Sequence, residues 1–223
     1  MHITIGKGGE LRVPQTTTPR SVGRRPEFTT CSITGDIIIS SGTVNVDGVL
    51  IVHGPVKFKM GTIQGEGQMQ ITHNGTLDIV YGKSPSDKRI IAIDELYVAT
   101  STVLLSPVTL NAGAKFKIAE THKLTTEIYG SISGSGTMIN GGEILIKTDP
   151  DFVCTISSNL DNSWKIVVNT GSKLKLAGKS GNKLTLRETS RITGDHMMSS
   201  ISDHVTLSTG TRVGGDIYGS VTL

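Results

Sequence analysis

Two short motifs carry residue types suited to catalysis, and both lack the spacing that the chemistry needs. Gly178-Lys179-Ser180 resembles the end of a phosphate-binding loop, but that loop requires a glycine where this chain has Lys173. Asp195-His196 and Asp203-His204 each place a carboxylate beside an imidazole, a pair that can orient a base or bind a metal. Neighbouring residues of a strand point to opposite faces, so neither dipeptide forms one site. We therefore expect turns and packing here, and predict no catalytic residue, metal ligand or cofactor site.

Carboxylates are the groups that would allow this chain to cleave polysaccharides, because hydrolysis of a glycosidic bond uses two of them. Asp47 and Glu66 are 19 residues apart, so they stack if the chain forms coils of that length. Each precedes a glycine, which favours a role at a corner, and Asp149-Pro150-Asp151 is typical of a turn. Sugar sites also use exposed aromatic rings, which are scarce here at 4% of the chain, with Trp164 and Tyr218 as candidates.

Internal repeats predict the elements that position these residues. The segment 108–119 returns at 166–177 and, in shorter form, at 205–213. A second theme at 47–52 returns at 66–71. Taken as three, two and one repeats respectively, the three intervals all give a unit of about 19–20 residues, so a single repeating unit explains them.

Each unit consists of a short strand of alternating apolar and polar residues, a turn with glycine, and a second such strand. Phe116 and Ile118, like Leu174 and Leu176, are expected to point inward while the lysines between them face solvent. Stacked units of this kind predict an all-β fold, a single-stranded parallel β-helix (β-solenoid) of roughly ten coils of about 19–20 residues over 31–223. A β-sandwich is the alternative, but it would not keep this fixed spacing.

Residues 1–30 differ from the rest of the chain in charge and composition. They hold five basic residues against two acidic ones, which equals the whole net charge of +3, and three of the seven prolines. This composition predicts an extended basic Pro/Thr-rich arm ahead of the solenoid. The candidate contacts to an acidic partner, such as nucleic acid, anionic lipid or a neighbouring subunit, are Arg12, Arg20, Arg24 and Arg25. A solvated tail is the alternative, and the neutral body disfavours a nucleic-acid groove there.

Cysteine and hydropathy patterns bear on the compartment. Cys31 and Cys154 match no metal or redox spacing and are expected to be two buried free thiols. The residues from Met1 to Lys7 lack the basic region and apolar run of a signal peptide. No apolar run approaches the length of about 18 residues that predicts a transmembrane segment. We expect a virion or cytoplasmic location.

Several segments resemble the bactofilins, bacterial proteins in which β-helices polymerise. The resembling segments are 190–195 and 211–221, with weaker examples at 32–37 and 45–50, and each contains a Gly-Asp or Asp-Gly turn beside an alternating strand. The resemblance implies a short β-helix between flexible tails that polymerises without nucleotide and docks on membrane. Similar strands rich in Gly, Thr and Asn occur in adhesin passengers and in phage or virus fibres and spikes.

The last residues keep the strand pattern, so we expect an uncapped solenoid end with Ile217, Tyr218, Val221 and Leu223 as the assembly interface. We predict a non-enzymatic structural protein that assembles with itself or packs with other structural subunits. A virion or phage component and a bactofilin-like filament are the two settings. The alternative function is a polysaccharide-binding or polysaccharide-cleaving β-helix, which predicts exposed aromatic rings and acidic residues in one groove. An adhesin exported without a cleaved signal is a third.

Overall fold

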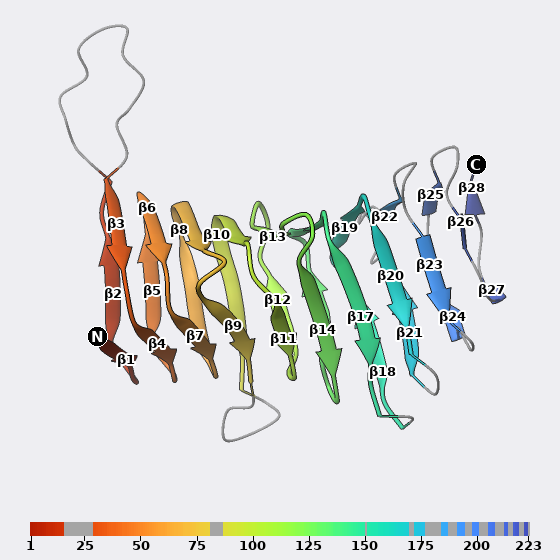
Figure 1. Ribbon diagram of the computed structural model, residues 1–223, viewed down its shortest axis with the longest axis horizontal. Helices are drawn as coiled ribbons and strands as arrows, with labels where there is room; N and C mark the ends of the chain where they lie inside the picture. Colours follow the sequence, from red (N-terminus) through yellow and green to blue (C-terminus); the bar gives the residue numbers. More distant parts are fainter. Residues whose placement is uncertain are drawn as a thin grey trace, which may run out of the picture.

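The computed structural model describes residues 1–15, 29–80, 87–149, 151–169 and 172–176, and the backbone of seven strands between residues 184 and 222. These residues form strands and turns only, with no helix. The strands of successive coils pair in parallel and stack side by side along a rod, with the two chain ends at opposite ends (Figure 1). The all-β fold and the β-solenoid expected from the repeats are therefore confirmed.

The first face of the rod is a parallel sheet of ten strands, each supplied by a successive coil. Its strands are β1 (His2–Ile5), β4 (Asp36–Ile39), β7 (Pro55–Phe58), β9 (Thr76–Ile79), β11 (Thr102–Leu104), β14 (Lys123–Glu127), β17 (Glu143–Lys147), β20 (Lys165–Val168), β23 (Arg191–Gly194) and β26 (Arg212–Val213).

The other two faces are joined into one sheet of 16 strands. The second face holds β2 (Glu10–Val13), β5 (Thr43–Val46), β12 (Val108–Leu110), β15 (Ile132–Gly134), β18 (Val153–Ile156) and β21 (Lys173–Leu176). The third face holds β3 (Thr30–Ile33), β6 (Val49–Val52), β13 (Lys115–Ile118), β16 (Thr137–Asn140), β19 (Asn159–Asn162), β22 (Leu184–Leu186), β25 (Val205–Leu207) and β28 (Val221–Thr222). Two long strands, β8 (Gly61–Ile71) and β10 (Arg89–Val98), run through both faces and connect them. The remaining two strands, β24 (Met198–Ser200) and β27 (Asp216–Tyr218), form a separate pair.

The coils are less uniform than the sequence predicted. Ile37 pairs with Val56, which is the interval of the second repeat theme, but Ile166 pairs with Ile192, which lies much further along the chain. Insertions at the corners lengthen some coils while the strands keep their register. The prediction of roughly ten coils of equal length, all following the first 30 positions, is therefore wrong in detail.

The predicted N-terminal arm is also partly wrong. Residues 2–13 form β1 and β2, which pair in register with β4 and β5 of the next coil. Both strands alternate an inward apolar residue with an outward polar one, and this alternation places them in the solenoid. The rest of the predicted arm, from residue 16 to residue 28, lies outside the described residues.

Inward-pointing aliphatic and aromatic side chains fill the space between the three faces. On the third face one row runs along the rod through five successive coils, with every member 0% exposed: Leu50, Met69, Leu96, Phe116 and Met138. The inward pairs expected in β13 and β21 are buried as predicted. Each fully buried side chain of this size contributes about 1.5–3 kcal/mol, so the rows are the main source of stability.

Glycines allow the coils to stack closely at the corner between the second and third faces. Gly48 and Gly67 occupy this corner on successive coils, and a Cβ on Gly67 would lie 2.0 Å from the Gly48 carbonyl oxygen. Asp47 and Glu66 directly precede these glycines, so they lie at the corner as predicted. The second repeat theme therefore marks a place where the backbone of one coil touches the next.

Candidate functional site

The first coil leaves one end of the solenoid open. Its strands β1, β2 and β3 each pair with the second coil, and within the described part of the chain no strand pairs with their outer edges. Ile3, Leu11 and Cys31 are the inward residues of these strands, and they are only partly buried. Their register partners on the second coil are 0% exposed: Ile37, Val44 and Leu50. We call Ile3, Leu11, Cys31 and the three outer strand edges the open end.

Arg12 is the one predicted partner-binding residue of the arm that lies within the described residues. It points outward from β2, with its side chain 65% exposed and its Nη2 atom 3.9 Å from Oδ2 of Asp47. An ion pair this exposed contributes less than about 1 kcal/mol, so Arg12 remains available to a partner. Arg20, Arg24 and Arg25 lie outside the described residues.

The predicted C-terminal interface is described only in its backbone. Ile217 and Tyr218 belong to β27, which pairs with β24, and Val221 belongs to β28, which pairs with β25. Leu223 lies outside the described residues. Strands β26, β27 and β28 are the last members of their sheets, so they form the far edge of the described rod.

A hollow with three carboxylates lies at the corner where β8 and β10 pass from the second face to the third. Its volume is about 260 Å³, and Glu66, Asp94 and Glu95 supply the carboxylates of what we call the acidic hollow. The register between β8 and β10 shifts here, because Ile93 pairs with Gly65 but Glu95 pairs with Gln68. This irregularity is a bulge, which redirects side chains at a corner.

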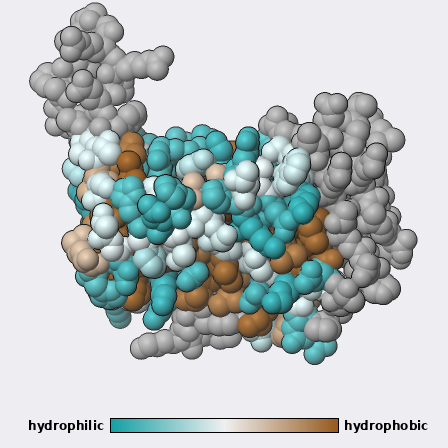
Figure 2. Space-filling model, viewed as in Figure 1, coloured by the Kyte–Doolittle hydropathy of each residue, from teal (hydrophilic) through white to brown (hydrophobic). Residues whose placement is uncertain are grey.

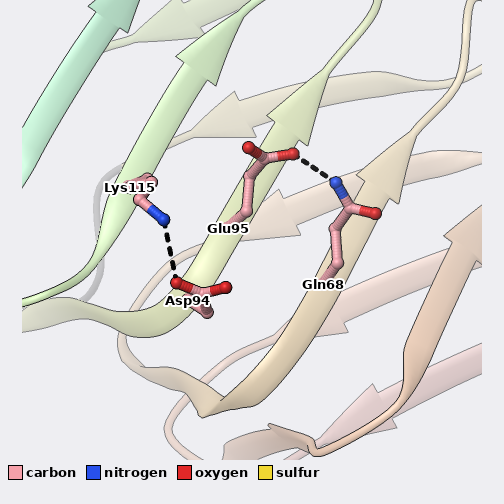
Figure 3. Close-up of polar contacts among 4 residues, drawn as sticks. All are labelled: Gln68, Asp94, Glu95 and Lys115. Atoms are coloured by element: carbon pink, nitrogen blue, oxygen red, sulfur yellow. Dashed lines mark hydrogen bonds and ion pairs between the residues drawn. The ribbon is translucent and has the colours of Figure 1, made fainter. Parts of the chain in front are cut away.

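The carboxylates of β10 in the acidic hollow are held by side chains of the neighbouring coils (Figure 3). Lys115 Nζ lies 3.0 Å from Oδ1 of Asp94, and the Gln68 amide donates a hydrogen bond to Glu95 from the opposite side. A group of three His, Cys, Asp or Glu side chains able to hold a metal does not occur among the described residues. These contacts support a role in tying three coils together.

A second cluster of charges lies on the first face. Glu143 on β17 lies between Lys123 on β14 and Lys165 on β20, with Nζ–Oε distances of 2.9 and 2.6 Å. The hydrogen bond from Lys165 lowers the pKa of the Glu143 carboxyl, and Lys123 adds to this effect while burial opposes it. The sequence signal was a Lys-Glu-Lys series at two unequal intervals, which a search for one fixed repeat length does not reveal.

Trp164 precedes Lys165 at the corner between the third and first faces. It is 49% exposed, which confirms that it is an exposed aromatic residue. It lines a polar hollow of about 300 Å³ together with Glu143 and both lysines. The acidic hollow belongs to other strands and another corner. The structure therefore does not bring Trp164 and the acidic hollow into one groove. The side chain of Tyr218 lies outside the described residues.

The two cysteines have different surroundings. Cys154 on β18 is buried, and burial raises the pKa of its thiol to about 12, with a smaller opposing effect from Thr126. Cys31 is only partly buried because it lies at the open end. The prediction of two buried free thiols is therefore correct for Cys154 and wrong for Cys31. Both thiols are free of disulfides.

The comparisons with known proteins identify no relative. No family model, curated protein or solved structure matches this chain. Within the described residues, no helix is long and apolar enough to cross a membrane.

Proposed function

We propose that this chain is a non-enzymatic structural protein that assembles end to end through its solenoid, as a virion or phage component or as a bactofilin-like filament. The open end is the observation that carries the proposal. Three parallel strand edges and three inward apolar side chains are presented there together. The proposed location is the virion or the cytoplasm, and the proposed partner is a second copy or another structural subunit.

The pairing between coils explains why a second copy would fit the open end. Every coil of the rod presents one edge of its three strands to the coil before it and the other edge to the coil after it. The last strands β26, β27 and β28 of one copy therefore offer the edges that β1, β2 and β3 of another copy lack. Such head-to-tail contacts repeat without closing, and they produce a filament. Exposed edges of this kind are templates for strand addition.

The arginines of residues 12–25 are proposed to strengthen this assembly. Arg12 is exposed on the first coil, close to the open end. We propose that Arg12, Arg20, Arg24 and Arg25 contact an acidic surface on a neighbouring subunit or another acidic partner. Salt would weaken such contacts, because exposed charges are screened within about 8–10 Å at physiological ionic strength.

Replacement of an inward residue at the open end tests the proposal. Leu11→Lys places a charge where a second coil would pack, and Thr4→Lys places the same charge on the outer surface of the same coil. Light scattering after size exclusion, with negative-stain imaging, should show filaments or oligomers for the wild type and for Thr4→Lys, and monomers for Leu11→Lys. A monomeric wild type would overturn end-to-end self-assembly.

The alternative, a polysaccharide-binding β-helix, is favoured by the half-exposed Trp164 in its polar hollow. Binding is better supported than cleavage, because two carboxylates of the acidic hollow have lysine or amide partners and its lining residues include no aromatic ring.

A further inference from the structure

The hollow beside Trp164 goes beyond the assembly role, because it lies on the side of the rod. We call it the Trp164 hollow, and its lining residues are Thr121, His122, Lys123, Glu143, Trp164 and Lys165. Figure 2 shows hydrophilic and hydrophobic side chains interleaved over one side of the rod. A polar hollow with one large exposed ring is the usual form of a site for a small polar ligand.

The stacking of three corners builds the Trp164 hollow. Lys123 pairs with Glu143, and the next register pair, Ile144 with Ile166, places Lys165 beside Glu143. One residue earlier on each coil stand His122, Gly142 and Trp164. Because Gly142 has no side chain, the corner between His122 and Trp164 contributes nothing that would fill the space. The two backbones are two strand spacings apart, about 9–10 Å, which leaves room for one sugar ring.

A buried asparagine ladder fixes the backbone that carries Trp164. Asn140 and Asn162 stack in the core, with Asn140 Nδ2 2.6 Å from Asn162 Oδ1. Asn162 Nδ2 donates to the Trp164 carbonyl oxygen at 2.7 Å, and Ser163 Oγ donates to the Asn140 carbonyl oxygen at 2.9 Å. The indole therefore projects from a rigid base, and little ordering is needed when a ligand binds.

The opposite rim of the hollow is held in an uncommon backbone conformation. Thr121 has φ = 67°, a left-handed value that β-branched residues adopt rarely. Such strain costs on the order of 1–3 kcal/mol and is concentrated at functional sites. The turn from Ala119 to His122 keeps this conformation through a hydrogen bond from the His122 amide to the Ala119 carbonyl.

The charges of the hollow indicate the ligand. Two ammonium groups and one carboxylate converge there, which leaves one positive charge in excess, and His122 supplies ring nitrogens. Glu143 offers an acceptor for hydroxyl groups, and it would repel a phosphate chain. Outside residues 1–30, the chain carries equal numbers of basic and acidic residues, so no extended basic surface continues from the hollow.

We propose that the Trp164 hollow binds an acidic saccharide. A sugar ring lies against the Trp164 indole, its carboxylate contacts Lys123 or Lys165, and its hydroxyl groups hydrogen-bond with Glu143 and His122. The apolar face of a sugar ring suits an aromatic face, and ammonium groups form strong hydrogen bonds with carboxylates.

Trp164 is the only tryptophan of the chain, so its fluorescence reports directly on the hollow. Titration of the full chain with tetragalacturonic acid should give a saturable change in emission. Maltotetraose, a neutral saccharide of the same length, should bind at least about tenfold more weakly, because it cannot use the excess positive charge. A cytidine tetranucleotide serves as an acidic competitor without a sugar carboxylate.

Variants assign the binding to the hollow. By calorimetry, Trp164→Ala should weaken tetragalacturonate binding about tenfold or more, whereas Tyr129→Ala, which removes a ring 43% exposed and outside the hollow, should not. Lys165→Met should weaken binding and reduce its dependence on salt. Leu11→Lys should bind as the wild type does, so failure of end-to-end assembly would not affect this test. The absence of a saturable signal, an unchanged affinity in Trp164→Ala, or equal or tighter binding of maltotetraose or the tetranucleotide would overturn the proposal.

Discussion

The middle of the solenoid and its open end contain the same alternating strands but bury them to different degrees. In β13 the inward Phe116 is 0% exposed, because coils pack on both sides of it. In β2 the inward Leu11 is only partly buried, because a coil packs on one side alone. Burial in a solenoid therefore depends on neighbouring coils more than on the residue itself. An end coil is the place where a second copy gains the most by packing.

The largest difference is expected when an inward side chain is removed. Phe116→Ala leaves a cavity between two coils and should lower the free energy of unfolding by about 3–5 kcal/mol. Leu11→Ala, compared with the wild type at dilutions where both are monomeric, should cost about 1 kcal/mol, because a coil covers this side chain on one side only. Denaturant titration followed by circular dichroism measures both. Equal losses would contradict the contrast between middle and end.

Thiol reactivity should separate the two regions in a single molecule. Burial raises the pKa of Cys154 to about 12, which reduces its thiolate roughly a thousandfold relative to an ordinary thiol. In monomeric Leu11→Lys, a thiol reagent should therefore label Cys31 quickly and Cys154 only after unfolding. In the assembled wild type, Cys31 should be protected as well. Rapid labelling of Cys154 in the folded chain would show that the middle opens.

The asparagine ladder tests whether a polar row in the middle can be replaced. Asn140→Leu removes the hydrogen bonds to Asn162 and Gly142 and leaves buried polar groups without partners. We expect a loss of about 1–3 kcal/mol in the free energy of unfolding. Thr125→Ala, on the outer surface of β14, is the control and should change stability by less than about 0.5 kcal/mol. A neutral Asn140→Leu would mean that the ladder adapts to an apolar pair.

The smallest expected effect is the pH dependence that Glu143 contributes. Its folded-state pKa lies below the ordinary value of 4.5, so the triad with Lys123 and Lys165 stabilises the fold above about pH 4.5. This contribution is lost as the pH falls through the folded-state pKa. Because the lysines are substantially exposed, it should amount to less than about 1 kcal/mol. Thermal melts of wild type and Glu143→Gln between about pH 3 and pH 7 should converge at the acidic end, and a constant gap would exclude the carboxylate as the cause.

Sequence reasoning was most successful where a pattern repeats and least successful where a coil departs from it. The alternation of Phe116 and Ile118 identified the inward residues, and the pairs of acidic residue and glycine identified a corner. The arm was misjudged because β1 and β2 are very short strands, and charge and proline content outweighed so brief an alternation. The Trp164 hollow was not predicted as a site, because its parts come from three coils of unequal length.

The sequence by itself determined that this chain is an all-β solenoid, because inward residues must recur wherever strands stack on strands. It also determined which residues point inward, since alternation within each strand fixes the face. Only the tertiary structure decided where the coils begin, how long each one is and which residues of different coils meet. Leu11 and Phe116 occupy equivalent places in the alternation, and only the presence or absence of a neighbouring coil distinguishes them. Corner insertions change the interval between coils without altering the strands, so Lys123, Glu143 and Lys165 become neighbours only once the chain has coiled.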